Sequence, residues 1–588
     1  MPPEDAGITD GVHLGAPAEL RRACERLRED VATLALPLEL PGVEQARQEL
    51  GVLVAQLDDY LLPRLRRIDA PLLAVVGGST GAGKSTLVNS LVRRFVTRSG
   101  VLRPTTRSPV LIHHPYDSGA FLTQRILPGF ARVTSEAPEP LQPVDVDAPR
   151  VTALRLVPDQ GLAPGLAIID APDIDSLVET NRDLALQLLA AADLWIFVTT
   201  AARYSDAVPW DTLRTAVERG VSVAVVLDRV PAEAMAEVRV HLATLLRDRG
   251  LSTAPLFTIP ETTKDGDGFL PPELVRPLHG WLSRLARDSR SRDVVVRRTL
   301  VGALDSLHDR VKVIVAAAQA QASADERLRA VIGDVYDVTD ARLVAGLRDG
   351  GLLQGEVLAR WQEYVGTGEA FRGFDGAVGR FRERVAAVMR GRSAPHAPLG
   401  EAVRAAASAF AVTAARAAAE DVGGRWRARP GGEGLLALVP GGAGLPPGFT
   451  ARVERVVVDW YTGIGDVVRS RAHGPRPNAR AAAFGVEGLA ALLAVRSLGD
   501  PEALTGDGAA AASAEGAVTV VADRLLRAAL GEEAVVLATA ARESLQARFA
   551  DLLTAERGRF TSGSDAAGVR PELAAILRGH LNAVEGAR

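Results

Sequence analysis

Apolar residues recur every three or four positions at both ends of this chain, which is the spacing of amphipathic helices. Near the N-terminus the residues with this spacing are Leu20, Cys24, Leu27, Val31 and Leu34. The spacing returns after residue 286, at Leu300, Leu304, Leu307, Val311 and Ile314, and near the C-terminus at Leu545, Phe549 and Leu552. The pattern predicts long helices at both ends that form an all-α bundle or coiled-coil stalk.

A different pattern fills the region between these ends. Short apolar runs occur at 72–76, 151–157, 166–169, 194–198, 221–227 and 256–259. Helical patterns separate several of them, for example at 181–192 and 232–249. Buried strands that alternate with helices predict an α/β domain with a mostly parallel sheet and helices on both faces.

The two patterns divide the chain into five predicted segments. These are N-terminal helices of the bundle (1–70), the α/β domain (71–285), a helical stalk (286–430), a Gly- and Ala-rich segment (431–522) and C-terminal helices that return to the bundle (523–588). We expect the last segment to pack against the first, because both carry the same helical stripe.

Composition narrows the class of protein. The chain has 588 residues, 47% hydrophobic and 24% charged, which suits a folded multidomain protein. Its net charge of -4 gives no basic field for nucleic acid. The single cysteine, Cys24, excludes a disulfide scaffold, and no apolar run reaches the length of a transmembrane helix. We expect a cytoplasmic protein, and the three lysines among many arginines suggest a GC-rich bacterial genome.

The strongest chemical signal is a phosphate loop between the first strand and a helix. It comprises Gly78, Ser79, Thr80, Gly81, Ala82, Gly83, Lys84 and Ser85, and Thr86 follows in the helix. This G-x-x-x-x-G-K-S sequence presents backbone N–H groups to phosphates at a helix N-terminus. We expect Lys84 to bridge the β- and γ-phosphates and the Ser85 hydroxyl to bind Mg²⁺.

Two further segments have the spacing of nucleotide-sensing switches. Residues 103–109 read Arg-Pro-Thr-Thr-Arg-Ser-Pro, in which Thr106, or its neighbour Thr105, is the candidate Mg²⁺ ligand that senses the γ-phosphate. Asp170 ends a buried strand and is the candidate acid that holds Mg²⁺ through water. Lys84, Thr106 and Asp170 are therefore predicted catalytic residues.

Together these motifs resemble those of bacterial dynamin-like GTPases. The similarity rests on the phosphate loop followed by Asn89, the Thr106-Arg-Ser-Pro switch and the Asp170-Ala-Pro turn, and it covers residues 72–285. The resemblance implies GTP as substrate, Mg²⁺ as cofactor and self-association through the GTPase domain. It also implies a possible related partner chain and action at an anionic membrane, at the inner face of the cell membrane.

Three positions depart from that family pattern. Thr80 stands where dynamins commonly carry a water-positioning Gln, so the resemblance implies Thr80 as a further catalytic residue, and Asp173 replaces a switch glycine. After the strand at 221–227, the chain reads Asp228-Arg229-Val-Pro instead of [Asn/Thr]-Lys-x-Asp, so the carboxylate that reads guanine is missing from its usual place. Asp228 from a shifted position and the stem of Arg229 remain as base contacts. A P-loop ATPase of the ABC type and a nucleotide-bound scaffold with weak or no hydrolysis are the alternatives.

The segment 431–522 contains the candidate membrane tip. Residues 481–498 are interrupted only by Glu487 and Arg496, and a second small-residue run follows at 509–521, so the two predict a helical hairpin. Arginines before it (Arg469, Arg471, Arg476, Arg480) suit anionic headgroups. The alternative is that both helices are packing elements of the bundle. Residues 431–448 are a second candidate loop, but their prolines favour a plain linker.

Overall fold

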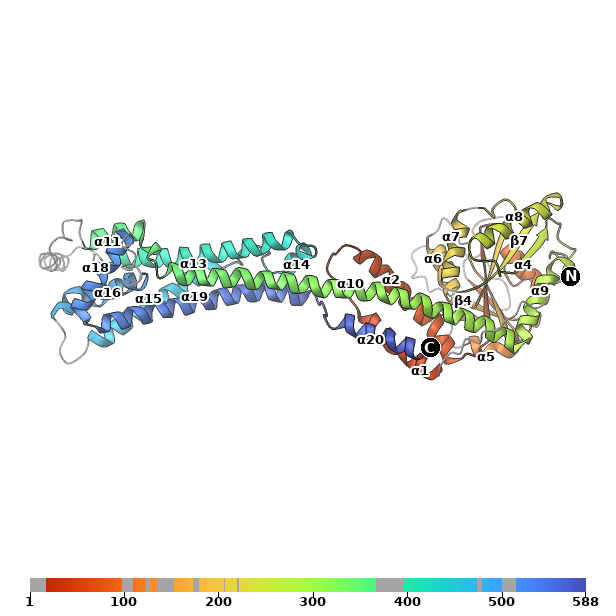
Figure 1. Cartoon of the computed structure of the whole chain (residues 1–588), viewed down its shortest axis with the longest axis horizontal. Coiled ribbons are helices and arrows are strands. Elements are labelled where there is room, and N and C mark those ends of the chain that lie inside the picture. The colour runs from red at the N-terminus through yellow and green to blue at the C-terminus, as the bar shows by residue number, and fades with distance from the viewer. Residues whose placement is uncertain are drawn as a thin grey trace. The chain divides into compact units, whose positions relative to one another are not determined.

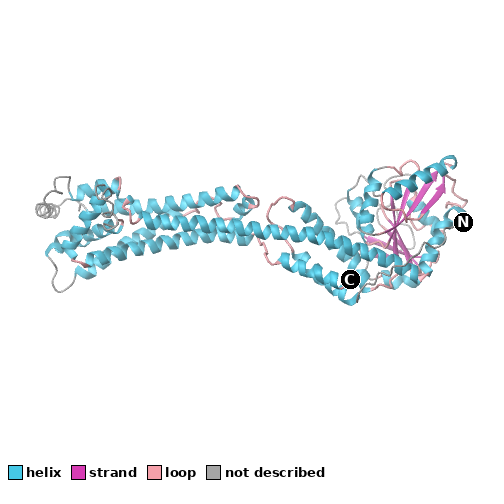
Figure 2. Cartoon of the chain, in the orientation of Figure 1, coloured by secondary structure: helices cyan, strands magenta, loops and turns pink. Residues whose placement is uncertain are grey.

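The computed structural model describes residues 17–97, 109–122, 127, 130–134, 153–172, 179–205, 207–218, 221–365, 396–472, 479–499 and 514–588. The chain divides into two compact units. Unit 1 comprises residues 1–34, 42–319 and 571–588, and unit 2 comprises residues 35–41 and 320–570. Figure 1 gives the order of the elements, and all strands of the described residues belong to unit 1 (Figure 2).

Unit 1 is built on an eight-stranded sheet of order β3-β4-β2-β5-β1-β6-β7-β8. The strands are β1 (Leu72–Gly78), β2 (Val110–His113), β3 (Ala131–Thr134), β4 (Ala153–Pro158), β5 (Leu166–Asp170), β6 (Leu194–Thr200), β7 (Ser222–Val230) and β8 (Leu256–Pro260). Only the β2–β5 pairing is antiparallel. The predicted mostly parallel sheet is confirmed, and the short strands β2 and β3 extend it beyond the predicted runs.

Helices cover both faces of this sheet, because alternate side chains of each buried strand face opposite cores. One core joins the strands to α4 (Lys84–Val92) and α9 (Pro272–Arg287). The other joins them to α6 (Glu179–Ala190), α7 (Ala207–Glu218) and α8 (Met235–Asp248). Shorter helices are η2 (Pro115–Asp117), α5 (Ser118–Phe121) and η3 (Ala232–Ala234).

Helices from both ends of the chain pack together within unit 1. They are α1 (Pro17–Thr33), α2 (Val43–Gln56), the π-helical turn η1 (Leu57–Leu61), α3 (Leu62–Arg66) and α20 (Leu573–Gly586). His580 of α20 bonds Asp30 of α1 at 2.6 Å, and Arg588 bonds Asp305 of α10 (Ser289–Gly346) at 2.6 Å. Most of the predicted segment 1–70 thus belongs to the unit of the sheet, because its apolar stripe is buried there.

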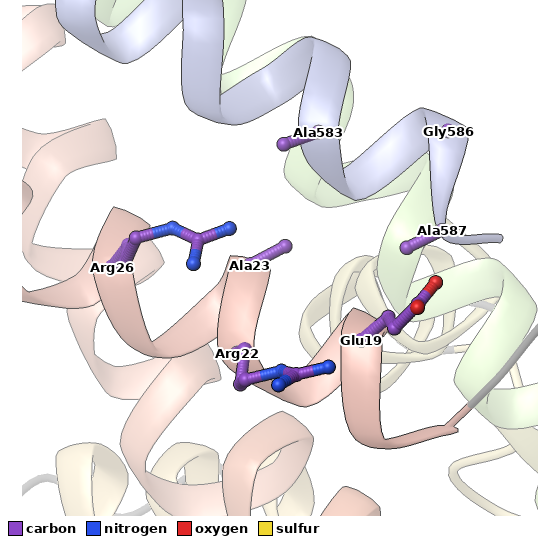
Figure 3. Close-up of a pocket in the computed structure, with 7 residues that line it drawn as sticks. All are labelled: Glu19, Arg22, Ala23, Arg26, Ala583, Gly586 and Ala587. Carbon is purple, nitrogen blue, oxygen red and sulfur yellow. The ribbon is translucent and has the colours of Figure 1, made fainter.

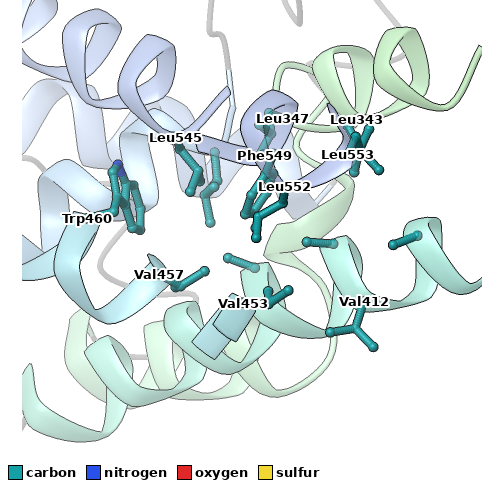
Figure 4. Packing of buried hydrophobic residues seen from close by; sticks show 14 of the residues in the cluster. Leu343, Leu347, Val412, Val453, Val457, Trp460, Leu545, Phe549, Leu552 and Leu553 are labelled. Atoms are coloured by element: carbon teal, nitrogen blue, oxygen red, sulfur yellow. The ribbon is translucent and has the colours of Figure 1, made fainter. Parts of the chain in front are cut away.

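Among its described residues, unit 2 contains helices, turns and loops but no strand. After the second half of α10 it contains η4 (Gly351–Leu353), α11 (Glu356–Val365), α13 (His396–Arg427), α14 (Gly432–Leu438), α15 (Phe449–Ala472), α16 (Ala479–Ser497), α18 (Ala514–Leu530) and α19 (Glu533–Ala566). One continuous core joins them, including Leu343, Val453 and Phe549 (Figure 4). The stripe Leu545, Phe549 and Leu552 therefore packs inside the bundle rather than on its surface.

Residues 489–498 and the described part of 509–521 pack into this core, whereas Glu487 is exposed, and residues 509–513 and Arg476 lie outside the described residues. Every residue of α16 from Leu489 onward is buried, as is Leu498 after it, and Arg496 makes an ion pair with Asp523 of α18 at 3.0 Å. The alternative in which these helices are packing elements is the one that the structure shows for the described residues. Within the described part of the chain, no helix has the length and hydropathy needed to cross a membrane.

The second candidate loop, 431–448, is not a plain linker. It contains α14, whose Leu435 and Leu436 are buried in the bundle. Arg559 of α19 donates to the carbonyls of Pro440, Gly442 and Gly444 at 2.7–2.9 Å, which fixes the turn after α14. The prolines therefore lie in a turn that Arg559 holds in place.

Candidate functional site

The phosphate loop connects β1 to α4, as the sequence predicts. Gly83 caps α4 with a φ of 92°, a left-handed conformation that favours glycine. A Cβ on Gly78 would lie 2.0 Å from the carbonyl oxygen of Val198, so this position has no room for a side chain. The glycines therefore let the loop pass close to β6 and start α4 with its N-terminus free to face an anion.

Three predicted residues meet at the start of α4. Ser85 Oγ donates to Asp170 Oδ2 at 2.7 Å, and Asp170 is completely buried at the end of β5. The register between β1 and β5 pairs Val76 with Asp170, which explains why the acid lies beside the loop. Lys84 Nζ donates to the carbonyls of Gly78 and Ser79, both at 3.0 Å, so its ammonium lies over the loop itself.

This pair of oxygen groups fits Mg²⁺. The ion prefers hard oxygen ligands, usually one or two side chains together with water and phosphate oxygens. Ser85 offers a hydroxyl and Asp170 a buried carboxylate at the same point. Elsewhere, among the described residues, no group of three or more His, Cys, Asp or Glu side chains is placed to hold a metal.

Two predicted switch residues cannot be placed. Thr106 and Thr105 lie outside the described residues, as does Asp173. Thr80 is half-buried within the loop. The structure therefore brings together Lys84, Ser85 and Asp170 and leaves the Thr106 assignment a prediction.

Asp228 lies against the phosphate loop rather than in an open base pocket. A Cβ on Gly83 would meet Asp228 Oδ2 at 2.3 Å, and the carboxylate is only 6% exposed. Its Oδ1 accepts from the N–H of Arg229 at 2.9 Å, and burial raises the pKa of Asp228 to about 6. Arg229 has a left-handed φ of 55° and an exposed side chain. Of the two expected base contacts, Asp228 thus supports the loop, whereas Arg229 is exposed.

A segment that the sequence analysis did not single out is tied to α4. The N–H of Leu270, after β8, donates to Ser90 Oγ at 2.9 Å, and Arg93 pairs with Asp265 at 2.6 Å. Because β7 and β8 are parallel, residues 261–264 follow β8 at the carboxyl ends of the strands, where the phosphate loop also lies. Lys264, one of only three lysines in the chain, lies in this segment and is exposed.

Asn89 has a structural rather than a ligand-binding position. Its amide oxygen accepts from the N–H groups of Val96 and Thr97 at 2.9 and 3.0 Å, and its amide nitrogen donates to the Thr97 carbonyl at 2.8 Å. It therefore fixes the chain that leaves α4 toward the first switch.

A buried ion pair anchors the opposite end of the sheet. Asp193, fully buried before β6, pairs with Arg64 of α3 and accepts from the N–H of Leu73 at 2.8 Å. Thr299 of α10 donates to the Asp193 carbonyl at 3.0 Å. These bonds connect β1, and hence the strand that carries the phosphate loop, to two helices from outside the α/β domain.

Comparison with known proteins agrees with this geometry. Residues 73–229 match the model of the dynamin family. No curated protein matches the chain.

Among solved structures, the chain resembles one from an oligomerised bacterial dynamin pair described as sensing and tethering membranes, with 10% identity, 97% of this chain and 94% of that chain covered, and a TM-score of 0.34. It also resembles Era in complex with MgGDPNP and part of 16S ribosomal RNA (17% identity, 36% and 57% covered, TM-score 0.23). A third is Toc33 from Arabidopsis thaliana with GDP and Mg²⁺, with 15% identity, 41% of this chain and 93% of that chain covered, and a TM-score of 0.24. The chain spans just over half of Era's length.

Proposed function

We propose that this chain hydrolyses GTP with one Mg²⁺ and couples turnover to the pairing of two chains, because residues 73–229 match the model of the dynamin family. The observation that supports the metal most directly is the 2.7 Å contact between Ser85 Oγ and Asp170 Oδ2 at the N-terminus of α4. Mg²⁺, when bound there, would neutralise charge that develops on the phosphate oxygens.

The residues of the loop do most of the remaining work. The N–H groups of the loop and the N-terminus of α4 hold the phosphates. Lys84 is already at the loop and exchanges its two carbonyl acceptors for phosphate oxygens. Phosphoryl transfer depends mainly on positioning and charge stabilisation, so this arrangement supports slow turnover without a dedicated base.

Base recognition in this proposal falls to residues beyond Asp228. Its carboxylate is buried against Gly83 and is not available to the N1 and N2 donors of guanine. Arg229 lies near the carboxyl end of β7, and the exposed residues 261–264 follow β8, its parallel neighbour. Both therefore lie at the end of the sheet where the phosphate loop is found. We propose that these two segments hold the guanine, with the stem of Lys264 or Arg229 against the ring.

Self-association follows from what one chain lacks at the site. Thr80 occupies the position where the family commonly has a Gln that orients the attacking water. We propose that a second copy, or a related partner chain, completes the site across the nucleotide. A rise in mass by light scattering with GDP and aluminium fluoride tests this, and a monomer in every nucleotide state contradicts it.

We also propose that the chain acts at a membrane, as its resemblance to bacterial dynamin-like GTPases implies. Within the described residues, both tip segments lie in unit 2. We place the protein in the cytoplasm, peripheral to the inner face of the membrane. Co-sedimentation with anionic vesicles tests that placement.

The experiment for the core function is phosphate release with GTP and with ATP, each with and without anionic vesicles. Lys84→Ala is expected to abolish turnover and tight triphosphate binding. Lys312→Ala is the matched control, because Lys312 is an exposed lysine of α10. Turnover of ATP alone would replace the GTPase by an ATPase, and binding without any turnover would leave only a scaffold.

A further inference from the structure

Two solvent-exposed arginines of α1 line an open cavity, and neither guanidinium has a partner among the described residues. The cavity has a volume of about 370 Å³ and lies between α1 and α20 (Figure 3). Arg22 and Arg26 are four residues apart, so they lie on the same helix face. No hydrogen bond or ion pair joins either one to a residue that the structure describes. The neighbouring arginine Arg28, in contrast, pairs with Asp58 at 2.9 Å.

The opposite wall leaves room for a ligand. Ala583, Gly586 and Ala587 of α20 line it with side chains no larger than a methyl group. The C-terminus of α20 lies here, and its partial negative charge of roughly half an electron helps to hold guanidinium groups in place. Glu19 is the one acid that lines the cavity. Two positive charges therefore face one carboxylate and a partial charge, which leaves the cavity net positive.

Two like charges at this spacing repel one another on the helix surface. A ligand with several oxygens around one centre removes that repulsion. Cβ atoms at this spacing are about 5–6 Å apart, so two planar guanidinium forks can converge on one tetrahedral anion. We propose that this cavity binds a phosphate group, carried either by an anionic phospholipid or by a soluble phosphate ester.

The proposal is independent of nucleotide hydrolysis, because it rests on α1 and α20 rather than on the loop of α4. It also differs from the tip segments of unit 2, since the cavity lies within unit 1. The small residues opposite the arginines supply space for the glycerol or other substituent beyond the phosphate. A carboxylate has only two oxygens in one plane and fits two forks less well than phosphate does.

The test uses the full chain with two probes. Vesicles of phosphatidylcholine with and without phosphatidylglycerol test the lipid source, and glycerol 3-phosphate at constant ionic strength tests the soluble source. At a charged surface each arginine contributes ~1 kcal/mol, so Arg22→Ala with Arg26→Ala is expected to weaken vesicle binding about thirtyfold. Arg452→Ala with Arg455→Ala removes the same charge from the exposed side of α15 and is the matched control.

A second variant keeps the test independent of arginine removal. Ala583→Glu adds a carboxylate to the α20 wall, where it can pair with the two guanidiniums and displace the phosphate. It is expected to reduce binding as the double arginine variant does, with GTP turnover unchanged in both. If the arginine variant loses binding to vesicles but not to glycerol 3-phosphate, the ligand is the lipid. If it loses binding to glycerol 3-phosphate but not to vesicles, the ligand is the soluble ester. No binding of either probe, or equal losses in the double variant and its α15 control, overturns the proposal.

Discussion

Asp228 gives the sharpest quantitative prediction, because a buried acid touches the loop that must bind a polyanion. Burial raises its pKa from 3.8 to about 6. The folded chain therefore holds this proton over a pH range in which the unfolded chain has released it. The contribution of this group to the free energy of unfolding is therefore greatest below pH 4 and falls as the pH rises to about 6. At neutral pH this loss of unfolding free energy amounts to about 3 kcal/mol.

Asp228→Asn removes this cost and keeps the bond that fixes the residue. The amide oxygen still accepts from the N–H of Arg229, and no ionisable group remains beside Gly83. The variant is expected to be more stable than the wild type at pH 7 and to lose the fall in stability between pH 4 and 6. Triphosphate affinity at pH 7 is also expected to rise, because a negative charge beside the loop is gone.

The measurement must address unit 1 alone, since a chain of two units has no single unfolding free energy. The thermal transition that nucleotide raises reports on the unit that binds it. Asp59→Asn is the matched control. Asp59 is a buried acid of η1 whose pKa burial also raises to about 6, and it accepts from Gln187 of α6 at 3.4 Å. It should share the stability effect without the change in affinity. Parallel pH profiles for Asp228→Asn and the wild type would refute the reasoning.

Three further predictions follow from single contacts. Ser85→Ala removes the hydroxyl that meets Asp170, so nucleotide binding should require at least tenfold more Mg²⁺ in a metal titration, whereas Ser90→Ala should not. Asp193→Ala leaves Arg64 buried without its partner and should cost about 3–5 kcal/mol in the nucleotide-sensitive transition, while Arg64→Met together with Asp193→Leu should cost less. Arg496→Ala opens a gap between α16 and α18. It should reduce the unfolding free energy of unit 2 by about 2–3 kcal/mol and so lower the thermal transition that nucleotide does not raise. An unchanged midpoint would place Arg496 outside the core.

The sequence predicted the sheet well because its strands are buried on both faces. A run such as 194–198 is apolar at every position, and the strand found there, Leu194–Thr200, is buried throughout. The glycine spacing before Lys84 likewise determined the loop, since only a strand–loop–helix connection uses it. Strands β2 and β3 have four residues each, which is too short for a clear period.

What the sequence could not supply is the choice of neighbours. The stripe Leu20 to Leu34 predicts an amphipathic helix equally well whether it packs against the sheet domain or the stalk. Its burial in unit 1 depends on contacts such as Asp30 with His580, which are 550 positions apart. The position of Asp228 is of the same kind. It is set by the register of β6 and β7, which pairs Thr200 with Asp228, and by a Gly83 that leaves room for its carboxylate.

The segment 481–498 shows why composition alone does not separate a membrane tip from a protein core. Both environments accept long Ala and Leu runs, because each removes apolar surface from water. The difference lies in the charged residues. In α16, Arg496 finds Asp523 at 3.0 Å and the Gly499 carbonyl at 2.9 Å, and Asp523 also binds Arg527 at 2.7 Å. A charge that meets its partner on the next helix can be buried in protein, whereas the same charge in hydrocarbon would have no such acceptor. The acid at position 523, in the second helix of the hairpin, was therefore the residue that distinguished the two interpretations.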